Sequence, residues 1–90
     1  MDSIKLLARD IIKDLRENEL SNYADSLQKS IDKLDSSESA IEGLSEIEGA
    51  CHVKAYGDLY LETFSGWEWP NKVSKLGNMC RKKKEALQIS

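Results

Sequence analysis

The stretch that decides the fold is residues 3–16, SIKLLARDIIKDLR. Its apolar residues recur at steps of three and one and form a single stripe along an α-helix: Ile4, Leu7, Ala8, Ile11, Ile12 and Leu15. Charges of both signs occupy the remaining positions, and Asp2 or Ser3 can cap the helix by accepting a backbone N–H. A stripe this wide and apolar predicts a helix that is buried against other helices.

Three further helical segments follow this first one. The stripe resumes over residues 20–34 after a short polar gap, which predicts an antiparallel helical hairpin. A shorter stripe covers residues 40–47, and Pro70 suits the first turn of a last helix that continues to Leu87. The predicted fold class is therefore all-α: one compact domain, residues 1–90, built as a bundle of about four helices with an irregular loop between the third and last.

Composition limits the class of protein. The 90 residues are 40% apolar and 32% charged, which is too apolar for disorder and too polar for a membrane protein. No targeting segment and no run of about 18 apolar residues is visible, so we expect a cytoplasmic protein without a membrane partner. In that compartment Cys51 and Cys80 are expected to be reduced and partly buried, although they could in principle pair.

Charge and aromatic rings are unevenly distributed. Residues 1–68 hold seven Lys or Arg against fifteen Asp or Glu, a net −8, whereas residues 69–90 hold six against one, a net +5. Residues 35–69 carry eight acidic side chains, and five of the six aromatic residues fall in the last fourteen positions of that stretch. Aromatic side chains close to carboxylates are typical of a surface that binds a basic macromolecule. An acidic chain of pI 5.1 does not fit direct nucleic-acid binding.

Little in the sequence indicates catalysis. His52 is the only histidine, and the sequence shows no nucleophile with its base, no phosphate loop and no dinucleotide fingerprint. A zinc site would need Cys51, His52, Cys80 and a carboxylate, without the paired spacing of such sites. We therefore expect no enzyme activity, no small-molecule substrate, no cofactor and no metal. A minor enzyme or metal-binding protein using those three residues is the least favoured alternative.

The candidate contact residues lie in and around the predicted loop. Trp67 and Trp69 cannot face the same way on a helix, and Trp69 continues the core stripe, so Trp67 is the better contact residue. Like charges spaced along one helix face repel one another, which indicates that the acidic residues of the third helix serve a partner; the alternative is an incidental solvated face. The predicted partner-binding residues are Glu46, Glu48, Tyr56, Asp58, Glu62, Trp67 and Glu68.

The order of these features resembles the small helical immunity proteins of bacterial polymorphic and contact-dependent growth inhibition toxin systems. The resemblance is carried by the second-helix segment Asn22-Tyr23-Ala24-Asp25-Ser26-Leu27 and by the Gly57-Asp58-Leu59 step in the loop. The chain departs from it in lacking a dense glycine run in that loop and in carrying Trp67-Glu68-Trp69-Pro70. The resemblance implies an antitoxin that binds one cognate toxin, expected as a 1:1 complex with a basic nuclease domain.

Two hypotheses of function remain from the sequence. In the first, an acidic and aromatic surface neutralises a toxin by occupying its phosphate-binding site. In the second, the chain is a small helical adaptor or a self-associating regulatory protein that uses an apolar surface. A toxin gene next to this one would favour the first hypothesis, and a stable homodimer would favour the second.

Overall fold

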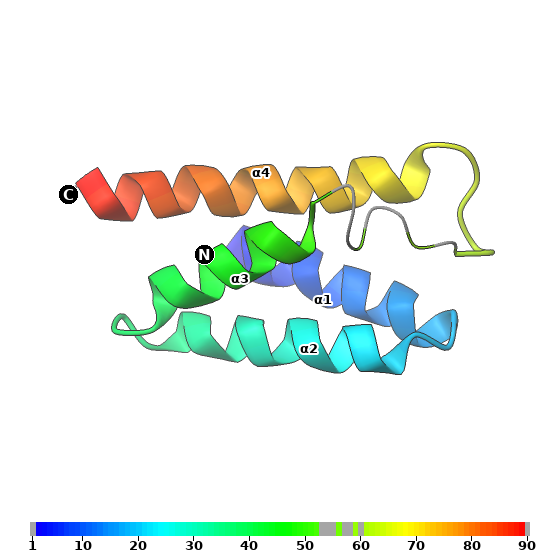
Figure 1. Cartoon of the computed structure of the whole chain (residues 1–90), viewed down its shortest axis with the longest axis horizontal. Helices are drawn as coiled ribbons and strands as arrows, with labels where there is room; N and C mark the ends of the chain where they lie inside the picture. The colour runs from blue at the N-terminus through cyan, green and yellow to red at the C-terminus, as the bar shows by residue number, and fades with distance from the viewer. Residues whose placement is uncertain (1, 53–55, 57–58, 60, 90) are drawn as a thin grey trace.

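The computed structural model describes residues 2–52, 56, 59 and 61–89. These residues form a short 3-10 helix, η1 (Lys33–Asp35), and four α-helices: α1 (Asp2–Glu17), α2 (Ser21–Asp32), α3 (Ala40–Ala50) and α4 (Glu68–Ile89). The described part of the chain contains no strand. The predicted all-α bundle, with an irregular segment between its third and last helices, is confirmed (Figure 1).

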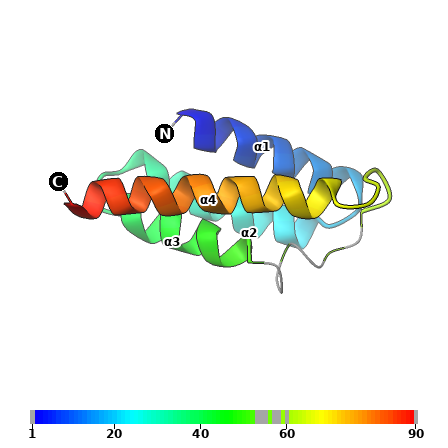
Figure 2. The same cartoon turned by 90° about the horizontal axis from the view of Figure 1, so that it is seen from above.

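The helices form an elongated bundle of 41 × 21 × 21 Å in which α4 runs along most of the long axis. α1 and α2 make the expected antiparallel hairpin, and α4 runs antiparallel to α1 (Figures 1 and 2). α4 packs most extensively against α3, whereas it meets α1 over a smaller surface. Lys72 joins these last two helices, because its Nζ lies 2.8 Å from Asp10 Oδ2 and also pairs with Asp14.

The core consists of the stripes that the sequence predicts. The core includes Ile11, Leu15, Leu27, Leu44 and Leu76, each of which is at most 1% exposed. They come from all four helices, so each helix contributes an apolar face to one shared interior. Burial of apolar side chains at about 25 cal/mol per Å² is the main favourable term for a chain of this size.

Two glycines mark places where helices approach closely. A Cβ on Gly43 of α3 would lie 2.8 Å from the Ser30 backbone oxygen of α2, and a Cβ on Gly77 of α4 would lie 3.0 Å from Cys51 Cβ. From the sequence alone both residues read as weak points in their helices, since glycine lowers helix propensity. The structure shows that they allow α3 to pack tightly between α2 and α4.

Candidate functional site

The segment before α4 is anchored to the bundle by its apolar residues. Leu61 is buried, and the Phe64 ring packs at 5.4 Å from the Trp69 ring. Asn18 Nδ2, in the turn between α1 and α2, donates a 2.9 Å hydrogen bond to Thr63 Oγ1. Two segments far apart in the sequence therefore meet at one end of the bundle (Figures 1 and 2).

Trp67 is displayed at this end by the local geometry of the start of α4. Gly66 has a φ of +57°, which glycine adopts at little cost, and the chain then enters the helix at Glu68. Ser65 Oγ donates a 2.8 Å hydrogen bond to Glu68 Oε1, and the Glu68 carboxylate lies at the positive end of the helix dipole. Trp67 is 77% exposed and Trp69 2% exposed, so the predicted division between the two tryptophans is confirmed.

A polar cavity of about 320 Å³ lies at the same end of the bundle, between the turn that joins α1 to α2 and residues 62–63 (Figure 1). It is lined by Glu17, Asn18, Glu19, Glu62 and Thr63. Glu19 has a φ of 61°, an uncommon conformation for a residue with a side chain, in the turn that the Leu20 amide closes on Leu15. Within the described residues the three carboxylates form no ion pair with a lysine or arginine of the chain.

We call this end of the molecule the acidic end and define it by Glu17, Glu19, Glu62, Trp67 and Glu68. Glu62, Trp67 and Glu68 were predicted as contact residues, and the structure places them on it, all exposed. Glu17 and Glu19 were missed. They lie at the end of α1 and in the turn that follows it, and no local signal in the sequence places that turn beside Glu62 and Thr63.

Glu46 and Glu48 lie elsewhere, on α3, and are engaged within the bundle. Glu46 pairs with Lys33 and accepts a 2.9 Å hydrogen bond from Ser30 Oγ, and both contacts hold the pKa of its carboxyl below its usual value. Glu48 Oε2 lies 2.9 Å from Lys84 Nζ of α4. The expectation that the acidic face of this helix has no structural use is therefore wrong, because lysines from neighbouring helices offset the repulsion.

Tyr56 is a core residue rather than an exposed contact. It is 7% exposed, its ring meets the Tyr23 ring edge-on at 5.4 Å, and its hydroxyl donates a 2.8 Å hydrogen bond to the Tyr23 backbone oxygen. Burial raises the pKa of the Tyr56 phenol. The prediction of Tyr56 as a contact residue is corrected on this ground. Asp58 lies outside the described residues.

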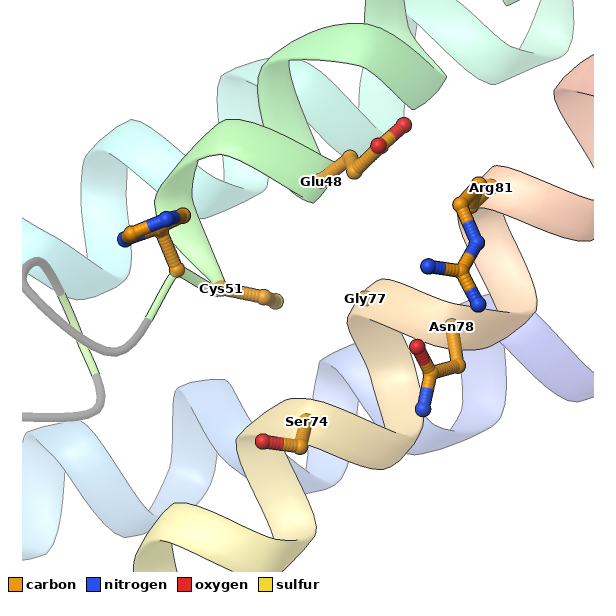
Figure 3. A pocket seen from close by; sticks show the side chains of 7 residues that line it. Glu48, Cys51, Ser74, Gly77, Asn78 and Arg81 are labelled. Atoms are coloured by element: carbon orange, nitrogen blue, oxygen red, sulfur yellow. The ribbon is translucent and has the colours of Figure 1, made fainter.

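A second cavity, of about 230 Å³, opens between α3 and α4 (Figure 3). It is lined by Glu48, Cys51, His52, Ser74, Gly77, Asn78 and Arg81, a combination that sequence reasoning did not assemble. Cys51 and Cys80 are free and buried, and burial raises the pKa of each thiol to about 12. Thiols of such high pKa stay protonated at neutral pH and are poor nucleophiles. The cavity thus offers hydrogen-bonding groups without an activated sulfur.

The described residues hold no cluster of three or more His, Cys, Asp or Glu side chains arranged to bind a metal ion. Among the same residues, no helix has the length and apolar character needed to cross a bilayer.

Comparisons of the chain with protein-family models, with curated proteins and with solved structures return no match.

Proposed function

We propose that this chain is an immunity-type protein that binds and neutralises a basic toxin, with the acidic end as its docking surface. The observation that carries the proposal is that one end of the bundle carries both the exposed Trp67, next to Glu68 in the chain, and the cavity lined by Glu17, Glu19 and Glu62 (Figure 1). No lysine or arginine of the described residues forms an ion pair with these four carboxylates. Tryptophan is among the residues that dominate binding energies at protein interfaces, and an exposed ring is available for such a contact.

The mechanism follows from charge and shape. Carboxylates clustered at one end of an elongated molecule attract a basic surface and speed its association, and this effect weakens as salt is added. Trp67 then supplies apolar contact area at small entropic cost. A nuclease toxin holds phosphates with lysines and arginines, so carboxylates in their place would block its substrate. This mechanism requires charge and apolar contact area at the acidic end and no catalytic acid, base or nucleophile.

The compartment is part of the same proposal. Cys51 and Cys80 are both free, and unpaired cysteines suit a reducing cytoplasm. A cytoplasmic antitoxin would meet its toxin after the toxin enters the cell or leaves the ribosome.

The test is growth protection by this chain against the product of the neighbouring gene, with binding measured by stopped-flow association. Glu62→Lys is expected to slow association and weaken protection, and Trp67→Ala is expected to speed dissociation by about tenfold or more. Glu38→Lys is the matched control, because it makes the same charge change in the connection between η1 and α3, at the opposite end of the bundle. If Glu62→Lys and Glu38→Lys behave alike, the acidic end is not the interface.

A further inference from the structure

A groove lies between α1 and α4, away from the acidic end. Its volume is about 550 Å³, and it is lined by Ser3, Leu6, Leu7, Asp10, Lys75 and Met79. The four α1 residues recur at i, i+3, i+4 and i+7, so they form one face of that helix, and the two α4 residues are one turn apart. Leu6 is 67% exposed, and with Leu7 and Met79 it gives the groove an apolar lining.

Residues of α1 and α4 that line the groove lie at similar heights along the two helix axes. Lys72 pairs with both Asp10 and Asp14, so it lies beside the α1 turn between them. Because α1 and α4 are antiparallel and rise 1.5 Å per residue, Lys75 lies at about the level of Asp10. By the same count Met79 lies at about the level of Leu6. One wall thus carries an acid and then leucines, and the other carries a base and then a methionine.

We propose that this groove is the interface of a homodimer with a two-fold axis running along it. Such an axis places the α1 wall of each copy over the α4 wall of the other. Asp10 then faces Lys75 of the second copy, and Leu6 packs against Met79 of the second copy. Each contact occurs twice. A surface that carries both partners of every contact is complementary to itself, which is the condition for a two-fold interface.

The charges of the groove favour a second copy over the basic partner proposed for the acidic end. Lys75 is exposed and forms no ion pair within the described residues, so a basic surface would be repelled there. A standard protein–protein interface covers roughly 800 Å² of each partner. The total accessible surface of this chain is 5647 Å², so such an interface would cover only a minor part of it. Because the groove lies along the side of the bundle, a dimer leaves both acidic ends open, and each copy can still bind one toxin. A homodimer formed through this groove is therefore compatible with the proposed antitoxin function and does not by itself favour a self-associating regulatory protein.

Sedimentation equilibrium of three samples tests the proposal: Lys75→Glu alone, Asp10→Lys alone, and an equal mixture of the two. Each variant alone places like charges opposite each other across the axis, so its dimer is expected to be at least about tenfold weaker than that of the unchanged chain. In the mixture every acid again faces a base, so heterodimers should form with an affinity close to the original.

The controls separate the groove from general effects of charge and folding. Lys82→Glu makes the same charge change as Lys75→Glu on an exposed part of α4 outside the groove, and it should leave the dimer intact. Leu6→Glu should give a monomer with an unchanged helical circular dichroism spectrum and unchanged toxin protection. A chain that stays monomeric at every concentration, or a mixture no tighter than its components, overturns the proposal and leaves the groove to a helix of another protein.

Discussion

The indole Nε1–H of Trp69 donates a 2.8 Å hydrogen bond to the backbone oxygen of Tyr56. Tyr56 in turn donates its hydroxyl to the backbone of Tyr23 on α2, so a chain of polar contacts crosses the core from α4 to α2. This relationship places the start of α4 relative to the hairpin. It thereby sets the direction in which the neighbouring Trp67 leaves the surface.

Trp69 and Trp67 are therefore expected to differ sharply in their effect on stability. Trp69→Ala should lower the free energy of unfolding by about 3–5 kcal/mol, and Trp69→Phe, which keeps an aromatic ring but removes the N–H donor, by about 1–3 kcal/mol. Trp67→Ala should change it by no more than about 0.5 kcal/mol. Urea unfolding followed by circular dichroism measures all three. Equal losses at the two tryptophans would contradict the structural role given to Trp69.

Gly43 and Gly49 of α3 provide a matched pair. Alanine at Gly43 would press its Cβ against the Ser30 backbone oxygen, which cannot rotate away, so Gly43→Ala should cost about 1–3 kcal/mol of stability. A Cβ at Gly49 meets nothing within 4 Å, and Gly49→Ala should stabilise the helix by about 0.5–1 kcal/mol. Thermal unfolding of both variants decides the point. A Gly43→Ala variant more stable than the unchanged chain would show that α2 and α3 pack less closely.

The Glu46 carboxyl predicts part of the acid sensitivity of the fold. Lys33 and Ser30 hold its folded pKa below the ordinary value of 4.5, so the unfolded chain binds the proton more tightly. The stabilisation is present above pH 4.5 and is lost as pH falls through the folded pKa. Glu46→Gln should therefore lose less stability than the unchanged chain between about pH 5 and pH 3. The urea midpoint measured against pH shows this, with the exposed Glu38→Gln as control; parallel curves would contradict it.

The buried thiols predict a response at high pH. Burial raises the pKa of Cys51 and of Cys80 to about 12, above the ordinary value of 9.0, so the folded state holds those protons more tightly than the unfolded state does. The resulting stability is present below pH 9 and is lost as pH rises toward 12. Near neutral pH a thiol reagent should label neither cysteine until denaturant unfolds the chain. Rapid labelling of Cys80, which is fully buried and does not line the cavity between α3 and α4, would mean that these helices separate readily.

Some features of the candidate site could be predicted from the sequence because their cause is local. A helix turns about 100° per residue, so Trp67 and Trp69 had to point in different directions, and Trp69 shares the stripe of Val73 and Leu76. Tyr56 had no such periodic neighbours. Its burial depends on meeting Tyr23, thirty-three residues away, which no local pattern specifies.

The carboxylates also show the difference between what the sequence predicts locally and what depends on contacts between distant residues. The sequence correctly shows that acidic residues are abundant, but whether a carboxylate is neutralised depends on which helix lies beside it. Glu46 meets Lys33, and Glu48 meets Lys84, so both are engaged inside the bundle. Glu62 meets the turn carrying Glu17 and Glu19 and stays unneutralised among the described residues. Spacing along one chain cannot distinguish these outcomes.

By itself the sequence determined which segments form helices and which face of each helix is buried, because apolar periodicity and glycine or proline positions act within a few residues. Only the tertiary structure decided which helix faces meet, and with them the acidic end and the groove between α1 and α4. Those surfaces depend on the order and the angles in which the helices pack, which are set by contacts between residues far apart in the chain.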